Sequence, residues 1–198
     1  MTWREALADL RTHHTPLVLW MLLGLGLTAA SAPNLATLVF GSALTLILIA
    51  SSEVDRRHHI LPDSLTLLVA LLGLGWLITQ TPMPLWWVGV AGAGVGGGGL
   101  WLLGRLGTWW AGQPALGLGD VKLLAALGLW VGLSGLPLVL LLATLPYLPW
   151  ALWQLYQRRR HPHLPTQALP FGPGLAFGGW ATWLWGAELW NLISHSVA

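Results

Sequence analysis

The chain alternates between long apolar runs and short breaks that are polar or rich in proline and glycine. A helix needs about 20 mainly apolar residues to cross a membrane. Seven runs approach this length, and together they predict an all-α polytopic membrane bundle with about seven transmembrane helices. The runs are Pro16–Ser31, Leu35–Ser52, Leu65–Gln80, Leu85–Gly104, Val121–Leu133, Leu136–Gln157 and Gly174–Ile193.

The breaks between these runs are short, so the pattern predicts a single domain over residues 1–198, with an extra amino-terminal helix at 16–31 and a core from about 35 to 198. The first run follows two arginines and ends in a small-x-small sequence at Ala30–Ala32, as in a signal peptide. Pro33 directly after this sequence argues against cleavage. We therefore expect this run to remain as a membrane helix.

The composition supports a surface that faces lipid. Hydrophobic residues make up 55% of the chain and charged residues only 8%, whereas soluble domains carry about 25% charged residues. The chain has no cysteine, which excludes disulfides, thiolate zinc sites and a cysteine nucleophile. The formal net charge of +2 gives no indication of nucleic-acid binding.

The basic residues indicate how the bundle is oriented. With seven spans, the amino terminus and the connections at 53–64, 105–120 and 158–170 share one side. Basic residues close to membrane spans stay on the cytoplasmic side, so we expect a cytoplasmic amino terminus and a carboxyl terminus outside. One continuous helix over 121–157 would move three arginines outside, which argues against such a helix. All nine Lys and Arg residues lie on or beside the first side: Arg4, Arg11, Arg56, Arg57, Arg105, Lys122, Arg158, Arg159 and Arg160.

Glycines are dense between Gly89 and Gly99. A phosphate-binding loop would need a following Lys-Ser or Lys-Thr, and neither is present. Gly92 and Gly96 are spaced as in a helix-packing motif, and so are Gly94 and Gly98. The segment therefore predicts a close contact between helices.

Two aspartates stand at the cytoplasmic ends of predicted spans. Asp55 ends the second span and Asp120 opens the fifth. Gly119–Leu133 reaches only about 22 Å at about 1.5 Å per residue, so Asp120 lies at or inside the boundary of a core about 30 Å thick. An ionisable group there is costly and is a candidate for function. Two carboxyl groups brought together share one proton, and such a pair can activate water and polarise a peptide carbonyl.

Each aspartate also has an ordinary structural interpretation. Asp120 precedes an apolar run and would suit a helix N-cap, and Asp63 has a stronger cap signature. Asp55 follows an apolar run and stands beside Arg56 and Arg57, as a boundary charge does. The adjacent histidines that follow these arginines do not converge well on one ion, so we expect no metal site. Taken singly, the aspartates leave the function open.

The wider sequence around the aspartates is more specific. The Gly-x-Gly-Asp sequence that ends at Asp120 is a weak signal alone, but it has an upstream Leu-Pro-Asp block and a downstream Pro-Phe-Gly-Pro block. Together, in this order, the blocks resemble those of the bacterial prepilin peptidases, the type IV leader peptidases of the GxGD aspartic protease class. The resemblance runs from about Leu35 to the end of the chain. The three blocks are residues 55–66 (DRRHHILPDSLT), 115–128 (ALGLGDVKLLAALG) and 169–180 (LPFGPGLAFGGW).

The resemblance implies an aspartic endopeptidase without a cofactor, in which Asp55 and Asp120 are the catalytic pair. The family removes short basic leaders from prepilin and pseudopilin precursors at the cytoplasmic face of the bacterial inner membrane. The cleaved bond typically follows a glycine and precedes the apolar pilin stem. Pilus assembly and type II secretion both use such precursors, and the sequence does not choose between them or predict an oligomeric state.

Four further residues receive supporting roles. Asp63 matches the second upstream aspartate of the family, and we interpret it as a cap or a supporting group. Lys122 matches the lysine that follows Gly-x-Gly-Asp, and either biases the aspartate pair by its charge or extends its ammonium toward the membrane surface. Gly117 and Gly119 are expected to let the substrate and the fifth helix approach closely.

The chain departs from the family pattern in two respects. Many members carry paired Cys-x-x-Cys motifs in an amino-terminal domain linked to methylation, and this sequence has no cysteine. We therefore expect peptidase activity without methyltransferase activity. An acidic residue that often precedes Gly-x-Gly-Asp is absent from residues 112–116, which bears on activity or substrate choice.

A different class of function remains open at this point. Paired carboxylates within a membrane also serve proton-coupled transport, and an inactive scaffold of a pilus or secretion machine is a further alternative. Both aspartates stand at one boundary instead of mid-membrane, and no inverted repeat with broken helices is visible. These features favour the peptidase.

Overall fold

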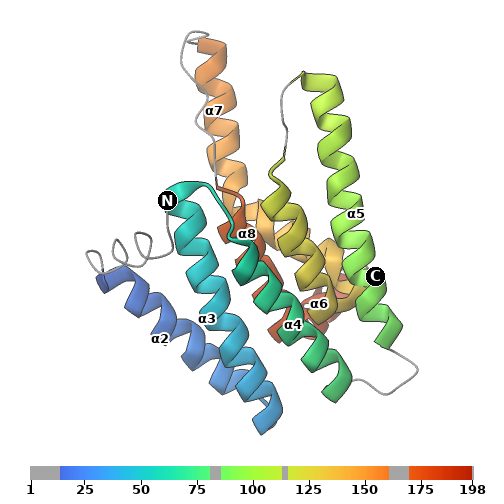
Figure 1. The fold of residues 1–198 in the computed structure, drawn as a ribbon. Helices are drawn as coiled ribbons and strands as arrows, with labels where there is room; N and C mark the ends of the chain where they lie inside the picture. The colour runs from blue at the N-terminus through green and yellow to red at the C-terminus, as the bar shows by residue number, and fades with distance from the viewer. Residues whose placement is uncertain (1–13, 81–85, 113–115, 161–169, 198) are drawn as a thin grey trace.

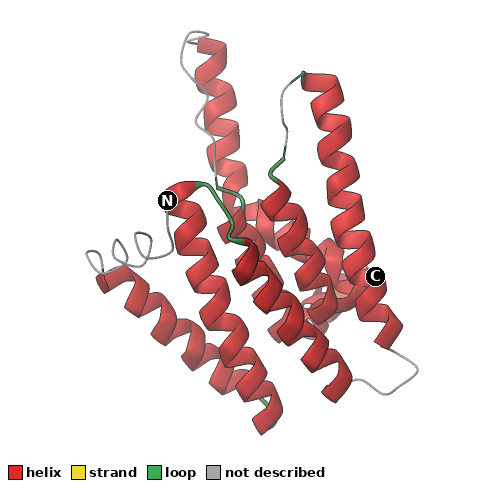
Figure 2. Cartoon of the chain, viewed as in Figure 1, coloured by secondary structure: helices red, strands yellow, loops and turns green. Residues whose placement is uncertain are grey.

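The computed structural model describes residues 14–80, 86–112, 116–160 and 170–197. Helices make up almost all of these ranges, and short loops join them (Figure 2). The helices run up and down against one another (Figure 1). Their bounds are α2 (His14–Ser31), α3 (Leu35–His58), α4 (Asp63–Gln80), α5 (Trp86–Ala111), α6 (Leu118–Thr144), a 3-10 turn η3 (Leu145–Tyr147), α7 (Leu148–Arg160) and α8 (Gly172–Val197).

Helix α6 consists of two arms that fold back on each other at Gly132. Gly132 has φ 67° and ψ −177°, a backbone conformation that glycine adopts readily. A straight helix would place Asp120 and Tyr147 about 40 Å apart, yet the two side chains lie close enough for their charges to interact. Gly96 also lies against both arms, at Leu124 and at Leu136. The reversal brings the end of the second arm back toward the start of α6 (Figure 1).

The reversal was predicted two to three residues later, at Ser134-Gly135. Helix α3 also differs from the prediction, because it continues past Ser52 to His58 and so includes Asp55 in its last turn. The predicted sixth helix, Leu136–Gln157, is interrupted by the 3-10 turn, with Pro146 inside the turn and Pro149 two residues after it. These prolines lack the N–H that a continuous helix needs.

The exterior of the bundle is apolar while its centre is closely packed. Large side chains such as Trp20, Ile78 and Trp110 are exposed by 66%, 77% and 83%. Within the described ranges, the helical segments long and apolar enough to cross a membrane are Leu35–His58, Trp86–Trp110 and Leu118–Tyr147. The last of these contains the reversal and therefore supplies two arms. The prediction of an all-α polytopic membrane bundle is confirmed.

Helix α2 is joined to the core by buried polar contacts. The Thr28 and Thr45 hydroxyl oxygens are 2.9 Å apart. The Trp180 Nε1–H of α8 donates to Thr45 Oγ1 at 2.9 Å and to Thr28 Oγ1 at 3.2 Å. Unsatisfied polar groups are costly away from water, so these bonds fix α2 against α3 and α8.

The glycine-rich segment forms the contact between α5 and the first arm of α6. A Cβ atom at Gly92 would lie 2.5 Å from the Gly128 carbonyl oxygen, and one at Gly96 would lie 3.1 Å from the Leu124 carbonyl oxygen. At Gly94 and Gly98 a Cβ atom would meet nothing within 4 Å. Of the two predicted packing pairs, Gly92 and Gly96 therefore make the close helix contact.

Gly92→Ala should destabilise the folded protein, whereas Gly94→Ala should leave it unchanged or slightly more stable. The methyl group at position 92 meets backbone atoms that cannot turn aside, and overpacking of this kind costs about 1–3 kcal/mol. At position 94 only the helix preference of alanine remains, worth up to about 1 kcal/mol. Thermal unfolding of both variants in the same detergent measures the difference. Equal melting temperatures would contradict the packing role of Gly92.

Candidate functional site

Asp55 is a buried carboxylate in the last turn of α3. Asp55 is only 6% exposed, so it is not the solvated boundary charge that its two neighbouring arginines suggested. Arg56 and Arg57 both bind Glu53, at 2.8 Å and 2.5 Å from its Oε1. The Asp55 Oδ2 instead accepts a hydrogen bond of 3.0 Å from the backbone N–H of Gly172, in the first turn of α8.

Gly172 approaches the Asp55 carboxyl group closely. A Cβ atom at Gly172 would lie 2.5 Å from Asp55 Oδ2 and 2.9 Å from Cγ. Only a residue without a side chain can therefore present its N–H here. The first-turn N–H groups of a helix have no partners within the helix, and the amino-terminal end of the helix dipole favours a carboxylate. The Pro-Phe-Gly-Pro block thus supplies a donor fitted to Asp55.

Asp120 lies in the first turn of α6, at the same end of the bundle. The N-cap position is Gly117, and no side-chain cap bond is formed there, so Asp120 is not the N-cap that its sequence suggested. Its side chain is half-buried and close enough to Asp55 for the two charges to interact. The structure therefore brings the two sequence-predicted aspartates together from helices that are far apart in the sequence.

Leu61 fills the space beside this pair. It is 8% exposed, and it lies between Gly119 and Gly172. A Cβ atom at Gly119 would be 2.8 Å from Leu61 Cβ, and one at Gly172 would be 3.1 Å from Leu61 Cδ1. The close approach at Gly119 is therefore to Leu61, whereas a Cβ atom at Gly117 would meet only Asp120 Oδ2, at 3.4 Å.

His59 turns the chain from α3 toward Leu61. It has φ 51° and ψ 34°, the left-handed conformation that commonly ends a helix, and its N–H donates to the Asp55 carbonyl oxygen at 2.8 Å. His59 is also near enough to the Asp55 carboxyl group for a charge interaction. Among the residues that the structure describes, no three His, Cys, Asp or Glu side chains are grouped to hold a metal ion.

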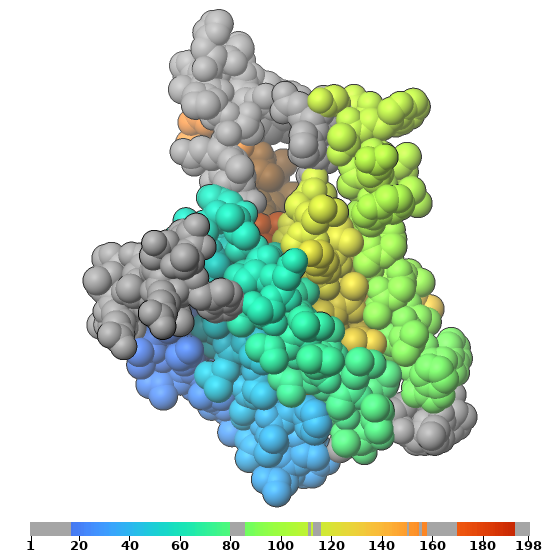
Figure 3. Space-filling view, in the orientation of Figure 1, coloured from blue at the N-terminus to red at the C-terminus, as the bar shows by residue number. Residues whose placement is uncertain are grey.

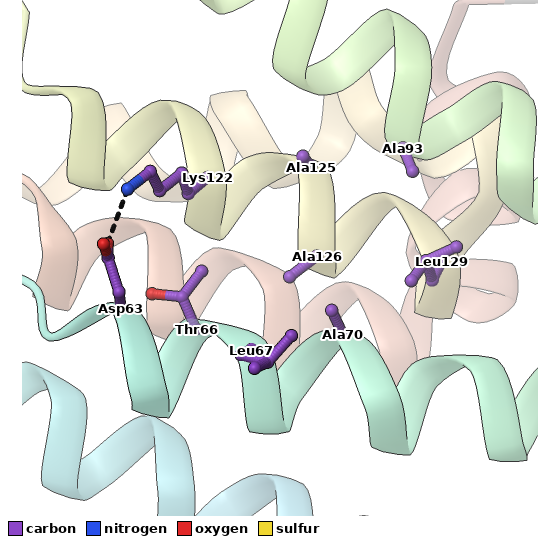
Figure 4. A pocket seen from close by; sticks show the side chains of 9 residues that line it. All are labelled: Asp63, Thr66, Leu67, Ala70, Ala93, Lys122, Ala125, Ala126 and Leu129. Atoms are coloured by element: carbon purple, nitrogen blue, oxygen red, sulfur yellow. Dashed lines mark hydrogen bonds and ion pairs between the residues drawn. The ribbon is translucent and has the colours of Figure 1, made fainter.

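Asp63 and Lys122 form an ion pair between the starts of α4 and α6, with Lys122 Nζ 2.6 Å from Asp63 Oδ1 (Figure 4). Both side chains are largely exposed. The Pro62 carbonyl oxygen accepts the first N–H bonds of α4, so Asp63 belongs to the first helical turn. The structure shows the Lys122 ammonium bound to Asp63, which is neither of the two roles considered for it from the sequence.

The ion pair stands at one end of an apolar groove of about 460 Å³ between α4, α5 and α6. Small side chains line most of it, and the labelled residues in Figure 4 show their arrangement. In the space-filling view the start of α6 reaches the surface between α4 and α5, beside this groove (Figure 3). The groove residues are Asp63, Thr66, Leu67, Ala70, Ala93, Lys122, Ala125, Ala126 and Leu129.

Sequence reasoning missed two groups at the site. The Gly172 N–H lies in the Pro-Phe-Gly-Pro block, so a signal was present, although the partner of the block was not evident. Tyr147 lies close enough to Asp55 and Asp120 for charge interactions with both. It stands alone in an apolar run, and its only signal is its place between two prolines.

The sequence matches one protein family and several named relatives. The type IV leader peptidase family matches residues 42–152. A prepilin leader peptidase/N-methyltransferase of Xanthomonas campestris is 40% identical over 156 residues, which cover 76% of this chain and 51% of that protein. A protein of the same name from Aeromonas hydrophila is 38% identical over 188 residues, covering 90% of this chain and 61% of its own length.

A prepilin leader peptidase/N-methyltransferase of Neisseria gonorrhoeae is 34% identical over 154 residues, covering 78% of this chain and 51% of the relative. The chain thus spans from about half to about three fifths of the length of these curated relatives. No solved structure matches the chain.

Proposed function

Because this chain belongs to the type IV leader peptidase family, we propose that it is an aspartic endopeptidase that cleaves the basic leader from prepilin or pseudopilin precursors. The observation that carries the proposal is the pairing of Asp55 and Asp120 at the ends of two membrane helices. The buried Asp55 carboxyl group is oriented by the Gly172 N–H, and Asp120 lies within reach of its charge.

The pair supplies both halves of acid–base catalysis. One carboxylate takes a proton from water as the water oxygen attacks the carbonyl carbon of the cleaved peptide bond. The other, protonated carboxyl group donates its proton to the carbonyl oxygen. As the tetrahedral intermediate collapses, the C–N bond breaks, the leaving amine takes the proton that the first carboxylate received from water, and a hydroxyl group of the intermediate returns a proton to the second carboxylate. No covalent enzyme intermediate is required.

We propose that the site faces the cytoplasm in the bacterial inner membrane, with the amino terminus inside and the carboxyl terminus outside. The support is the distribution of basic residues. Arg56, Arg57 and Lys122 lie at the same end of the bundle as the aspartates, and α7 ends at Arg160 there (Figure 1). In this view α6 and α8 begin lower than the tips of α5 and α7, which supports a site recessed within the bundle end.

We propose only the peptidase reaction for these residues. The names of the relatives join a peptidase to an N-methyltransferase, and the aspartate pair is the chemistry that the described part of this chain provides. The proposed unit is one peptidase domain, with α2 packed on the core and Asp63 and Lys122 supporting the starts of α4 and α6. Lipid surrounds the bundle, and prepilin or pseudopilin precursors are the substrates.

The proposal is tested with the purified chain in detergent. The substrate is a synthetic precursor with a basic leader, a glycine before the cleaved bond and an apolar stem, and the readout is its mass. A peptidase cuts this substrate without any ion gradient. Absence of cleavage over several such precursors, together with proton-coupled flux in sealed vesicles, would replace the proposal with the transporter alternative.

A further inference from the structure

Tyr147 is a polar-tipped side chain at the site to which nothing in the sequence pattern assigned a role. It ends the 3-10 turn that follows the second arm of α6. The reversal at Gly132 brings this turn back close to Asp120. The Tyr147 side chain is half-buried there. The turn thus places a phenol at the end of the bundle that holds both aspartates.

Tyr147 contacts the residues on either side of Gly172. The Tyr147 ring lies so close to Gly174 that a Cβ atom there would collide with it, and the Tyr147 hydroxyl oxygen lies within reach of the Gly174 N–H. On the other side, the Tyr147 and Phe171 rings pack with centroids 6.3 Å apart. Tyr147 therefore supports the turn in which Gly172 is presented.

The first N–H groups of α8 can be accounted for one by one. The Gly172 N–H donates to Asp55 Oδ2, Pro173 has no N–H, and the Gly174 N–H lies within reach of the Tyr147 hydroxyl oxygen. The Leu175 N–H donates to the Phe171 carbonyl oxygen at 3.1 Å and begins the regular helix. The donors that precede the regular helix take partners outside it, and side chains are one source of such partners. Asp55 and Tyr147 are the two side chains that lie against these donors.

We propose that Tyr147 is a positioning residue for the aspartate pair, an inference that rests on the peptidase function proposed above. Its hydroxyl group and ring keep the first turn of α8 in position, so that the Gly172 N–H stays hydrogen-bonded to Asp55. The interaction of Tyr147 with both aspartates places the phenol beside the pair itself. A peptide turn carrying two glycines is otherwise free to move, because glycine loses the most conformational freedom on ordering.

Tyr147→Phe tests the inference, with Tyr156→Phe as the matched control. Tyr156, the other of the two tyrosines, lies on α7 with its residue 46% exposed, and it loses the same hydroxyl group. Loss of one hydrogen bond that acts on the reacting geometry should lower kcat about tenfold in Tyr147→Phe. KM should remain within about twofold, because the change leaves the apolar ring and the substrate contacts in place. Tyr156→Phe should keep the wild-type kcat.

Amide hydrogen exchange gives a readout that does not depend on cleavage. In Tyr147→Phe the peptide covering 171–175 should exchange faster than in wild type, while peptides from α3 and α5 should not change. If kcat and local exchange both match the wild type, the inference is wrong. Faster exchange throughout the bundle, or a fall in kcat with no local change in exchange, also overturns it.

The two proposals fail separately. If wild-type protein cuts no precursor, the peptidase function fails, whereas the exchange of residues 171–175 still reports whether Tyr147 holds the turn. If wild type cleaves and Tyr147→Phe is indistinguishable from it in both measurements, only the positioning role is lost.

Discussion

Asp120→Asn should reduce cleavage of a prepilin-like precursor by about a thousandfold or more. General acid–base catalysis contributes about 10²–10⁴ in rate, and asparagine has nearly the same shape as aspartate but cannot take up or release the proton. Asp120 is not the N-cap residue of α6, so the fold should survive the change. The measurement is kcat/KM from the mass of the product, with the melting temperature in detergent as the test of folding.

Asp55→Asn should cause a loss of the same order, and the double variant should be no worse than either single one. Residues that act as one catalytic unit are strongly non-additive, because removing either member already removes the shared proton. The amide oxygen of asparagine can still accept the Gly172 N–H bond, so local structure should be kept. Additive losses in the double variant would contradict the pair.

Asp63→Asn is the matched control for both variants. Its carboxylate is exposed and bound to Lys122, and exposed ion pairs contribute only about 0–1 kcal/mol. Cleavage and stability should stay close to wild type. Cleavage that survived in Asp55→Asn and was lost in Asp63→Asn would transfer the first catalytic role to Asp63.

The sequence carries enough information for the architecture because two local signals are strong in a membrane. The length of each apolar run predicts a helix, and the basic residues predict which ends lie together. That charge pattern predicted the reversal within residues 121–157, where hydropathy alone is continuous. Its position was displaced, since Ser134-Gly135 gives the clearer turn signal while Gly132 has the positive φ. Which glycine adopts such a conformation depends on how α6 packs against α5. The local sequence does not specify that packing.

The site itself was predicted only in part, for a similar reason. Asp55 and Asp120 stand at helix ends, which sequence can locate. The contact of Gly172 with Asp55 joins residues that are far apart in the chain, and it depends on where α8 begins against α3. Tyr147 reaches the site through the reversal of α6 and the following 3-10 turn. Neither contact leaves a periodic signal, so the structure was needed to find both groups.

Gly172→Ala should lower kcat about 10- to 100-fold while leaving the bundle folded. The added methyl group would stand 2.5 Å from Asp55 Oδ2, so the carboxyl group or the start of α8 must move. Either movement breaks the Gly172 N–H bond, and a hydrogen bond to a charged group is worth about 1.5–3 kcal/mol. The loss appears in kcat because the bond orients a reacting group.

Gly186→Ala provides the control on the same helix. A Cβ atom there would meet only Thr182 Cγ2, at an ordinary 3.4 Å, so activity and melting temperature should stay near wild type. Making Gly172→Ala in the Asp55→Asn variant separates loss of the orientation of Asp55 from a general distortion of α8. If Gly172 acts through Asp55, adding Gly172→Ala to Asp55→Asn should cost little further activity, because coupled residues share one loss. A full further loss in the double variant would show that position 172 acts on the reaction by another route.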